Sequence, residues 1–389
     1  MKTRMMVAAT LCLALAAGCK KKDKDQQTGT TTGSAPVAKT QEAPPPPPPK
    51  PVEPPKPAPK TGKDLAQAFI DCGNLLSAGK FEDFGKQCVA ESFVNHEAGE
   101  KDMTGAELMP MFQSMRTAFP DMKFEPQLVM VNGRTIIAVV LMTGTNDGPL
   151  KTPMGELPAT KKKVGTLVYE RFAMNDENKA TERWGFGDPA TMMGQLGQLP
   201  KGAPPVRPAM EKGMPDAPVI IVAADDDKEK ANVAAIKKQT EPFNAKKTAD
   251  MMAAFADDAV EADQASDKDV KGKKAIEKGM QMFWKAFSDG KVDVPNVWGI
   301  GDYVVSEGTF TGTNDGPMDK MPKTGKKVSM PYAEIVKFKD GKTTEMWRFR
   351  NGVDMAMQLG LMPMPKPGDA GKGADAGKGA APPKAEPKK

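Results

Sequence analysis

The stretch Thr-Gly-Thr-Asn-Asp-Gly-Pro at residues 143–149 occurs again, without a single change, at residues 311–317. Two shorter motifs follow it in both places: Glu-x-Trp at 182–184 and 345–347, and Gln-Leu-Gly at 195–197 and 358–360. Because the motifs keep their order and nearly their spacing, the repeat predicts two tandem copies of one domain. A period this long is typical of duplicated domains rather than of a solenoid.

The segments outside the two copies have the composition of linkers and tails. Eleven of the sixteen residues at 44–59 are proline, which favours an extended polyproline II segment. Asp-Ala-Gly-Lys-Gly occurs at 369–373 and again at 375–379, in a stretch without apolar periodicity. The sequence therefore predicts six segments: a signal peptide at 1–18, a disordered Lys/Pro-rich tether at 19–63, domain 1 at 64–200, a linker at 201–227, domain 2 at 228–362, and a disordered Gly/Ala/Lys tail at 363–389.

Composition narrows the class of protein. The 389 residues include 37 glycines and 36 prolines, more than a single globular domain of this size would hold. One histidine and four cysteines exclude a multi-histidine metal site and a cysteine-rich zinc module, so we expect no metal and no cofactor. The formal charge of +5 comes from the flanking segments, because the two copies together are acidic, and we therefore expect no nucleic-acid partner.

Each copy begins with helices. In the first copy, the spacing of apolar residues predicts helices at 64–77 and 81–90. Thr104 and Glu107 have the spacing of a capping box, which predicts the start of a third helix that ends at Phe119. A short helix closes each copy, and its C-terminal glycine is Gly197 or Gly360.

Strands fill the rest of each copy. Hairpins are predicted for the pairs 127–131 with 135–143, 164–174 with 180–186, and 332–338 with 343–349. Asn132-Gly133 predicts a type I′ turn in the first of these hairpins, and Asp340-Gly341 predicts the turn in the last. Helices followed by hairpins predict the α+β class, with three N-terminal helices packed on a curved antiparallel sheet in each domain.

This order of elements resembles the SnoaL-like polyketide cyclase family, which belongs to the nuclear transport factor two-like superfamily. Several motifs are similar to the family pattern: Phe-Val-Asn-His at 93–96, Ala-Phe-Pro-Asp at 118–121, Thr-Gly-Thr at 143–145, Gly-Lys-x-Val at 325–328, Asp-Gly-Lys at 340–342, and the two repeated motifs Glu-x-Trp and Gln-Leu-Gly. The resemblance covers nearly all of both copies. It implies two cone-shaped domains, each built around a cavity.

The resemblance also implies candidate site residues. In the cyclases of this family, an acid four residues after the tryptophan is the general acid–base of an intramolecular aldol closure. That position holds Asp188 in the first copy and Asn351 in the second, and an amide does not exchange protons near neutral pH. The catalytic candidates are Asp188 and His96, and the ligand-binding candidates are Trp184, Trp347, Asn146, Asn314 and Asn351.

Structural roles remain open for the same residues. Asp188 precedes Pro189, which is ordinary N-cap chemistry for a helix. His96 is also interpreted as a histidine of a loop or strand edge, and the tryptophans as core residues. Cys72 and Cys88 lie on the first two helices, and the matching region of the second copy has no cysteine. In an oxidising compartment we expect them to form a disulfide, and the alternative is a pair of inert thiols.

The N-terminus predicts export. Lys2 and Arg4 precede an apolar stretch at 7–17, which is too short to span a bilayer but has the length of a signal sequence. Leu-Ala-Ala-Gly-Cys at 15–19 resembles a bacterial lipobox, so Cys19 is the expected lipidation site and the membrane an expected partner. By analogy with lipoprotein sorting, the lack of an acidic residue directly after Cys19 implies the outer membrane, facing the periplasm. The alternative is an ordinary secretory signal.

Three functions fit this sequence. The first is an envelope lipoprotein whose tandem domains bind a small hydrophobic ligand or a partner without turnover. The second is a cyclase or isomerase that uses Asp188 in the first copy, with the second copy degenerate. The third is a structural spacer of the envelope. Because cones of this kind pair through their sheets, we also expect the two domains to pair as an intramolecular pseudo-dimer.

Overall fold

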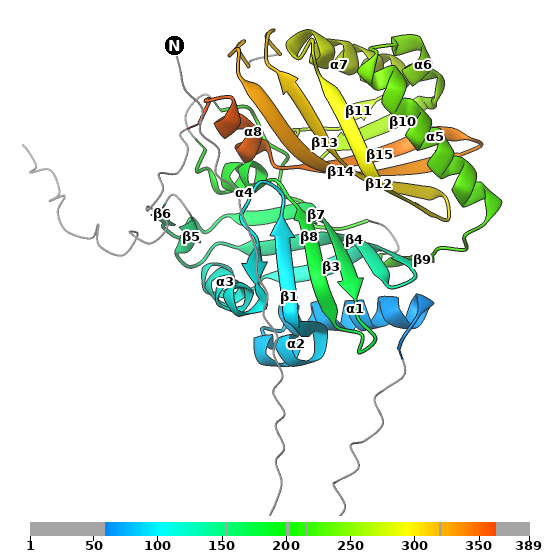
Figure 1. Cartoon of the computed structure of the whole chain (residues 1–389). Coiled ribbons are helices and arrows are strands. Elements are labelled where there is room, and N and C mark those ends of the chain that lie inside the picture. Colours follow the sequence, from blue (N-terminus) through cyan, green and yellow to red (C-terminus); the bar gives the residue numbers. More distant parts are fainter. Residues whose placement is uncertain (1–58, 153–154, 200–202, 215–216, 319–320, 363–389) are drawn as a thin grey trace, which may run out of the picture. The chain divides into compact units, whose positions relative to one another are not determined.

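The computed structural model describes residues 59–362 except 153–154, 200–202, 215–216 and 319–320 (Figure 1). The described residues belong to one compact unit. The predicted signal peptide, Cys19, nearly all of the tether and the C-terminal tail lie outside the described residues.

Domain 1 places its first three helices before most of its strands, as predicted. The helices are α1 (Gly62–Ser77), α2 (Phe81–Cys88) and α3 (Gly105–Ala118), and α4 (Pro189–Leu196) closes the domain. The main strands are β1 (Val89–Glu97), β2 (Met103–Thr104), β3 (Lys123–Asn132), β4 (Thr135–Thr145), β7 (Lys163–Met174) and β8 (Ala180–Phe186). With β9 (Val219–Val222) they form one sheet in the order β2-β1-β8-β7-β4-β3-β9, while β5 (Leu150–Thr152) and β6 (Gly155–Leu157) form a separate two-stranded sheet.

Domain 2 repeats this arrangement. Its helices are α5 (Asp227–Asn244), α6 (Thr248–Ala253), α7 (Lys273–Ala286) and the closing α8 (Gly352–Gln358). Its strands are β10 (Phe255–Asp263), β11 (Val270–Lys271), β12 (Lys291–Ile300), β13 (Tyr303–Thr313), β14 (Lys327–Lys339) and β15 (Lys342–Arg350), in the sheet order β11-β10-β15-β14-β13-β12. The predicted α+β class with two repeated domains is confirmed.

Two features of the sheets escaped sequence reasoning. Strand β1 begins at Val89, inside the predicted second helix, and it pairs with β8 in parallel, as β10 does with β15. The burial pattern of β1 does not alternate cleanly, so it carries little of the signal by which strands are recognised. Strand β9 lies in the predicted linker and pairs in parallel with β3, so part of the linker extends the sheet of domain 1.

The two predicted hairpin turns differ in outcome. Asp340 (φ 51°) and Gly341 (φ 71°) both have positive φ between paired Lys339 and Lys342, as a type I′ turn requires. In the first hairpin Asn132 pairs with Thr135, so the turn residues are Gly133 and Arg134, and only Gly133 (φ 58°) has positive φ. The hairpin is therefore confirmed, but the type I′ turn at Asn132-Gly133 is wrong because the register lies one residue further on.

The repeated motif joins the end of β4 to the end of α3. The backbone N–H groups of Asp147 and Gly148 donate to the Ala118 carbonyl, at 2.9 and 3.1 Å. A Cβ atom at Gly148 would lie 2.2 Å from the Thr117 carbonyl oxygen, so only glycine fits. The Cβ position of Gly316 lies equally close to the carbonyl oxygen of Lys285. The same close approach explains why both copies of the motif keep this glycine.

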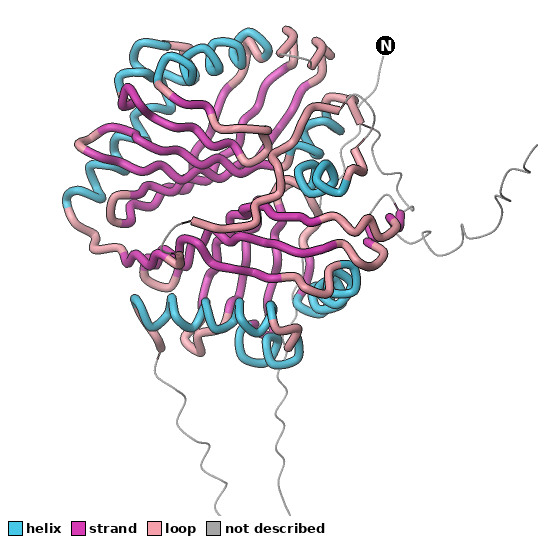
Figure 2. The backbone as a smooth tube through the Cα atoms, turned by 180° about the vertical axis from the view of Figure 1, so that it is seen from behind, coloured by secondary structure: helices cyan, strands magenta, loops and turns pink. Residues whose placement is uncertain are grey.

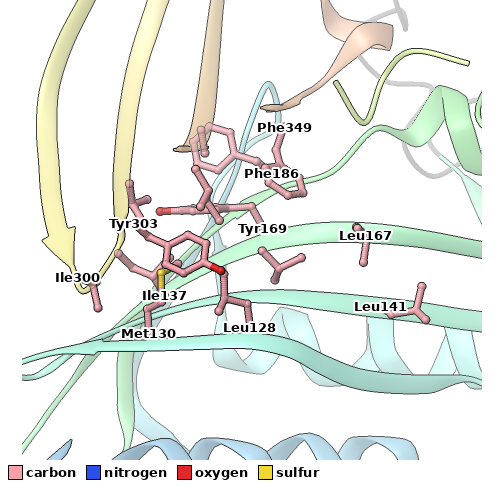
Figure 3. Close-up of a cluster of buried hydrophobic side chains, with 14 residues drawn as sticks. Leu128, Met130, Ile137, Leu141, Leu167, Tyr169, Phe186, Ile300, Tyr303 and Phe349 are labelled. Carbon is pink, nitrogen blue, oxygen red and sulfur yellow. The ribbon is translucent and has the colours of Figure 1, made fainter. Parts of the chain in front are cut away.

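The sheets of the two domains face each other, and the helices cover their outer faces (Figures 1 and 2). One buried cluster between the sheets draws on both domains (Figure 3). Domain 1 contributes residues such as Leu128, Ile137 and Tyr169, and domain 2 contributes residues such as Ile335 and Phe349. Further buried clusters lie between the helices and the sheet of each domain, so each sheet is covered on both faces.

A disulfide joins the first two helices of domain 1. The sulfur atoms of Cys72 in α1 and Cys88 at the end of α2 are bonded, and the two Cα atoms lie 5.9 Å apart. In domain 2 the structurally matching helices α5 and α6 contain no cysteine. The covalent link therefore restrains the helices of domain 1 alone.

Replacing both Cys72 and Cys88 by alanine is expected to lower the free energy of unfolding by about 3 kcal/mol. The bond closes a loop between residues 16 positions apart, and its loss raises the conformational entropy of the unfolded chain. Urea unfolding under oxidising conditions measures the difference. Under reducing conditions the variant and the unaltered chain should unfold together, and a difference that persists there would contradict this account.

Candidate functional site

Asp188 is the N-cap of α4 and also reaches the other domain. Its Oδ2 atom accepts hydrogen bonds from the Thr191 backbone N–H (3.0 Å) and hydroxyl (2.7 Å). Its Oδ1 atom accepts from the backbone N–H of Gly352 in domain 2, at 2.9 Å. The side chain is buried. Both carboxylate oxygens are therefore held by donors of the fold, as in a helix cap.

Asn351 has the matching position in domain 2, and its side chain also caps a helix and makes a hydrogen bond to the other domain. Its Oδ1 atom caps α8 by accepting from the Asp354 N–H (3.0 Å), and its Nδ2 atom donates to the Ala98 carbonyl of domain 1 (3.0 Å). The difference between the copies follows from these partners. Residue 188 faces an N–H group and needs an acceptor, whereas residue 351 faces a carbonyl and needs a donor.

The change Asp188→Ala is expected to lower the free energy of unfolding by about 1–3 kcal/mol, because the α4 cap and the bond to Gly352 are both lost. Asp188→Asn keeps one acceptor oxygen for the cap and should cost less than the alanine change. Thermal or urea unfolding of both variants measures the order. Equal losses for Ala and Asn would contradict this order, because they would mean that the remaining amide oxygen does not support the cap.

His96 lies on the sheet face that looks toward domain 2. Its ring stacks on Trp184 with 5.0 Å between ring centroids. Its Nδ1 atom is 2.9 Å from Asp102 Oδ1, and its Nε2 atom is 3.4 Å from Glu182 Oε2. Within the described residues, His96 and Asp188 share no hydrogen bond, so the two catalytic candidates do not form a pair.

The Trp184 ring also contacts Arg171, which reaches across to domain 2. The guanidinium carbon of Arg171 lies 3.5 Å from the Trp184 ring centroid and 5.2 Å from that of Trp298 in domain 2. Arg171 binds Glu307 of domain 2 through two hydrogen bonds, Nε to Oε1 at 2.7 Å and Nη2 to Oε2 at 2.9 Å. Trp347 packs on the same shared cluster. Both candidate tryptophans, Trp184 and Trp347, therefore lie at the contact between the domains.

The repeated asparagines Asn146 and Asn314 hold loops. Asn146 Nδ2 donates to the Gly148 carbonyl (2.8 Å), and its Oδ1 accepts from the Thr160 N–H (2.8 Å). Asn314 makes the matching bonds to Gly316 and Thr324 at 2.8 and 2.7 Å. Both side chains are fully buried. Their polar atoms are used by the backbone, which is a sufficient reason for their presence.

A polar cluster that sequence reasoning missed lies on the helix-covered face of domain 1. Arg183 of β8 donates to Glu170 Oε1 (Nη2, 2.8 Å), Glu97 Oε2 (Nη1, 2.6 Å) and Asn95 Oδ1 (Nη1, 2.7 Å). Burial alone would lower the pKa of the Arg183 guanidinium, but the Glu97 and Glu170 carboxylates outweigh it and raise that pKa above its ordinary value. Nearby, burial and the Glu97 charge raise the pKa of the Glu100 carboxyl.

Domain 2 has a similar cluster with its arginine in another place. Arg348 donates to Glu334 Oε1 (2.7 Å) and Glu261 Oε1 (2.8 Å). By the Glu-x-Trp alignment Arg348 matches Gly185, and Arg183 matches Met346. A Cβ atom at Gly185 would lie 2.5 Å from Arg183 Nη1, so the domain 1 guanidinium fills the space that glycine leaves.

Within the described ranges, no helix is long and apolar enough to cross a membrane. The same ranges hold no group of three or more His, Cys, Asp or Glu side chains placed to bind a metal ion.

The structure defines a protein with two tandem α+β domains, each with helices packed on one main sheet. The sequence model described as SnoaL-like polyketide cyclase matches residues 63–196 and 234–359, more than half of the chain. The chain belongs to this SnoaL-like polyketide cyclase family and contains two copies of the family's domain.

Solved structures of single copies are similar to this chain. AclR from Streptomyces galilaeus has 24% identity and a TM-score of 0.32, and the match covers 35% of this chain and 85% of AclR. A SnoaL-like protein from Jannaschia sp. CCS1 has 21% identity and a TM-score of 0.34, covering 36% and 97%. IdmH from Streptomyces antibioticus has 22% identity and a TM-score of 0.30, covering 33% and 98%. No curated protein matches the chain.

Proposed function

We propose that this protein binds a small molecule in a SnoaL-like domain without turning it over. The observation that supports this most is the state of Asp188, the residue at the family's acid position. Both of its oxygens accept hydrogen bonds, one of them from the other domain. A general acid–base exchanges a proton with its substrate, whereas neither oxygen of Asp188 is free of a hydrogen bond to the fold while the domains stay together.

The proposal includes a place in the cell. The lipobox-like stretch ending at Cys19 supports a lipid anchor, and the Pro-rich segment 44–59 supports a spacer between the membrane and the domains. The protein would then face the periplasm from the outer membrane. Labelling cells with a radioactive fatty acid tests the anchor, since Cys19→Ser should abolish incorporation.

The pairing of the domains is part of the same proposal. The shared cluster, the Arg171–Glu307 pair and the two hydrogen bonds exchanged by the helix caps support an intramolecular pseudo-dimer. In this proposal the ligand binds between the helices and the sheet of a domain, away from the contact between the domains. Small-angle scattering on the chain tests this pairing. Paired domains give the distance distribution of one compact particle, whereas unpaired domains give a distance distribution with two separated maxima.

A cyclase or isomerase is the second candidate, since the acid of the family pattern is retained as Asp188 in one copy. Native mass spectrometry of the purified chain tests both candidates. If a bound molecule is released with its mass unchanged, the result supports binding without turnover. If the molecule is converted and the conversion stops in the Asp188→Asn variant, the result supports an enzyme. A chain that is empty when purified from several hosts would favour a spacer.

A further inference from the structure

The Asn95 side chain in domain 1 has a buried hydrogen-bond donor that no described residue satisfies. Asn95 lies on β1 beside Arg183 of β8 and is fully buried. Its Oδ1 atom accepts from Arg183, so the orientation of the amide is determined, because a guanidinium can only donate. Its Nδ2 atom has no partner within the described residues. A buried donor without an acceptor costs about 1–3 kcal/mol.

Free acceptors lie on the same cluster. Arg183 uses Oε2 of Glu97 and Oε1 of Glu170, and the second oxygen of each carboxylate has no hydrogen bond within the described part of the chain. The Glu97 and Glu170 side chains are 26% and 16% exposed, so solvent reaches them. Next to Arg183, Phe172 belongs to the apolar cluster under the helices. The site thus offers one donor and two acceptors beside an apolar wall.

Domain 2 lacks this combination. The residue that matches Asn95 in strand register is Glu261, which faces Met346 across the strands as Asn95 faces Arg183. Glu261 accepts from Arg348 and has no donor to leave unpaired. In addition, Asp263, which matches Glu97, is held by Arg350 at 2.9 Å. Domain 2 therefore shows that a carboxylate fits at this position and leaves no unpaired side-chain donor there.

We propose that domain 1, and not domain 2, binds one uncharged molecule that carries a hydroxyl group on an apolar body, at the Asn95–Arg183 cluster. This inference rests on the proposed binding function. A hydroxyl group accepts from Asn95 Nδ2 and donates to Glu97 or Glu170, which no anion and no ammonium group can do together. An anion is also repelled, because two carboxylates surround one guanidinium.

Access requires one movement. Asn95 Nδ2 is buried, and the side chain of Arg183, which binds the other end of the amide, is 16% exposed. The guanidinium lies in the space beside Gly185, at the end of a long side chain. A ligand hydroxyl reaches Asn95 Nδ2 when the guanidinium shifts within this space and keeps its hydrogen bonds to Asn95 Oδ1 and Glu170.

The experiment measures binding to the full chain at pH 7 by equilibrium dialysis. The probes share one ring system: 2-naphthol, naphthalene, 2-naphthoate and 2-naphthylmethylammonium. The variant Asn95→Glu installs the domain 2 residue, and Glu261→Gln changes the matching residue of domain 2. We expect one 2-naphthol per chain, with the other three probes and the Asn95→Glu variant each about tenfold weaker or more, and Glu261→Gln unchanged.

Four outcomes would overturn the inference: naphthalene or the charged probes bind as tightly as 2-naphthol, Asn95→Glu binds 2-naphthol normally, Glu261→Gln loses it, or no probe binds. The melting temperature shows whether Asn95→Glu remains folded, and the near-isosteric Asn95→Asp replaces it if not. Native mass spectrometry separates this failure from that of the proposed function. A purified ligand that persists in Asn95→Glu refutes this site but leaves the binding function standing.

Discussion

Replacing Arg171 by methionine is expected to lower the free energy of unfolding by about 3–5 kcal/mol, one of the largest effects of any single change in this chain. The side chains of Arg171 and Glu307 are only 11% and 8% exposed. Without the guanidinium, the Glu307 carboxylate stays buried between the two sheets with no opposite charge. Chemical denaturation of the variant measures the loss.

The neighbours of this pair cannot repair the loss. The Tyr169 hydroxyl donates to Glu307 Oε1 at 2.8 Å, and burial together with the Glu307 charge raises the pKa of this hydroxyl well above its ordinary value. Tyr169 therefore remains a neutral donor. Asn296 Nδ2 is 3.5 Å from Glu307 Oε2, at the limit of a hydrogen bond. Neither group supplies the charge that Arg171 provides.

A double replacement separates the burial of the charge from the value of the pair. Arg171→Met with Glu307→Met should be more stable than Arg171→Met alone, because no unpaired charge remains. The exposed pair Lys86–Glu82 serves as the control, and Lys86→Met should produce no measurable change, since both side chains face solvent. If the double variant had a lower free energy of unfolding than Arg171→Met alone, the ion pair itself, rather than the burial of an unpaired charge, would account for the loss of stability.

The fold could be predicted from the sequence because its signals are local or repeated. The capping box is an example: the Thr104 N–H donates to Glu107 Oε2 at 2.8 Å, within one helical turn. The motif at 143–149 is another, since its glycine has a steric reason that both copies share. Strand β9 had no such signal, because its four residues gain their structure only by pairing with β3.

The site was harder to predict because its contacts are long-range and differ between the copies. The bond from Gly352 to Asp188 joins residues 164 positions apart, so only the docked domains show that the second oxygen of this N-cap aspartate is also used. The arginines of the two polar clusters occupy non-matching positions, 183 and 348, so the repeat hides them. A charged residue in the middle of a strand was the only signal, and such residues more often face solvent.

Phe349→Ala is the second change with a large expected effect, about 3–5 kcal/mol of unfolding free energy. Phe349 lies on β15 of domain 2, is 1% exposed, and its ring centroid is 5.9 Å from that of Tyr169 in domain 1. Removing the ring leaves a cavity that both sheets line. Leu361→Ala is the control, because Leu361 is 43% exposed and its truncation should change little.

The place where Phe349→Ala acts distinguishes two kinds of tandem protein. If the shared cluster makes the domains one cooperative unit, hydrogen exchange should accelerate in β7 of domain 1 as well as in β14 and β15 of domain 2, since Tyr169 and Phe349 unfold together. If each domain were stabilised by its own helix-covered core alone, β7 would keep its protection. The first result is expected, because the cluster between the sheets takes large side chains from both domains and the polar bonds at its edge cross the same seam.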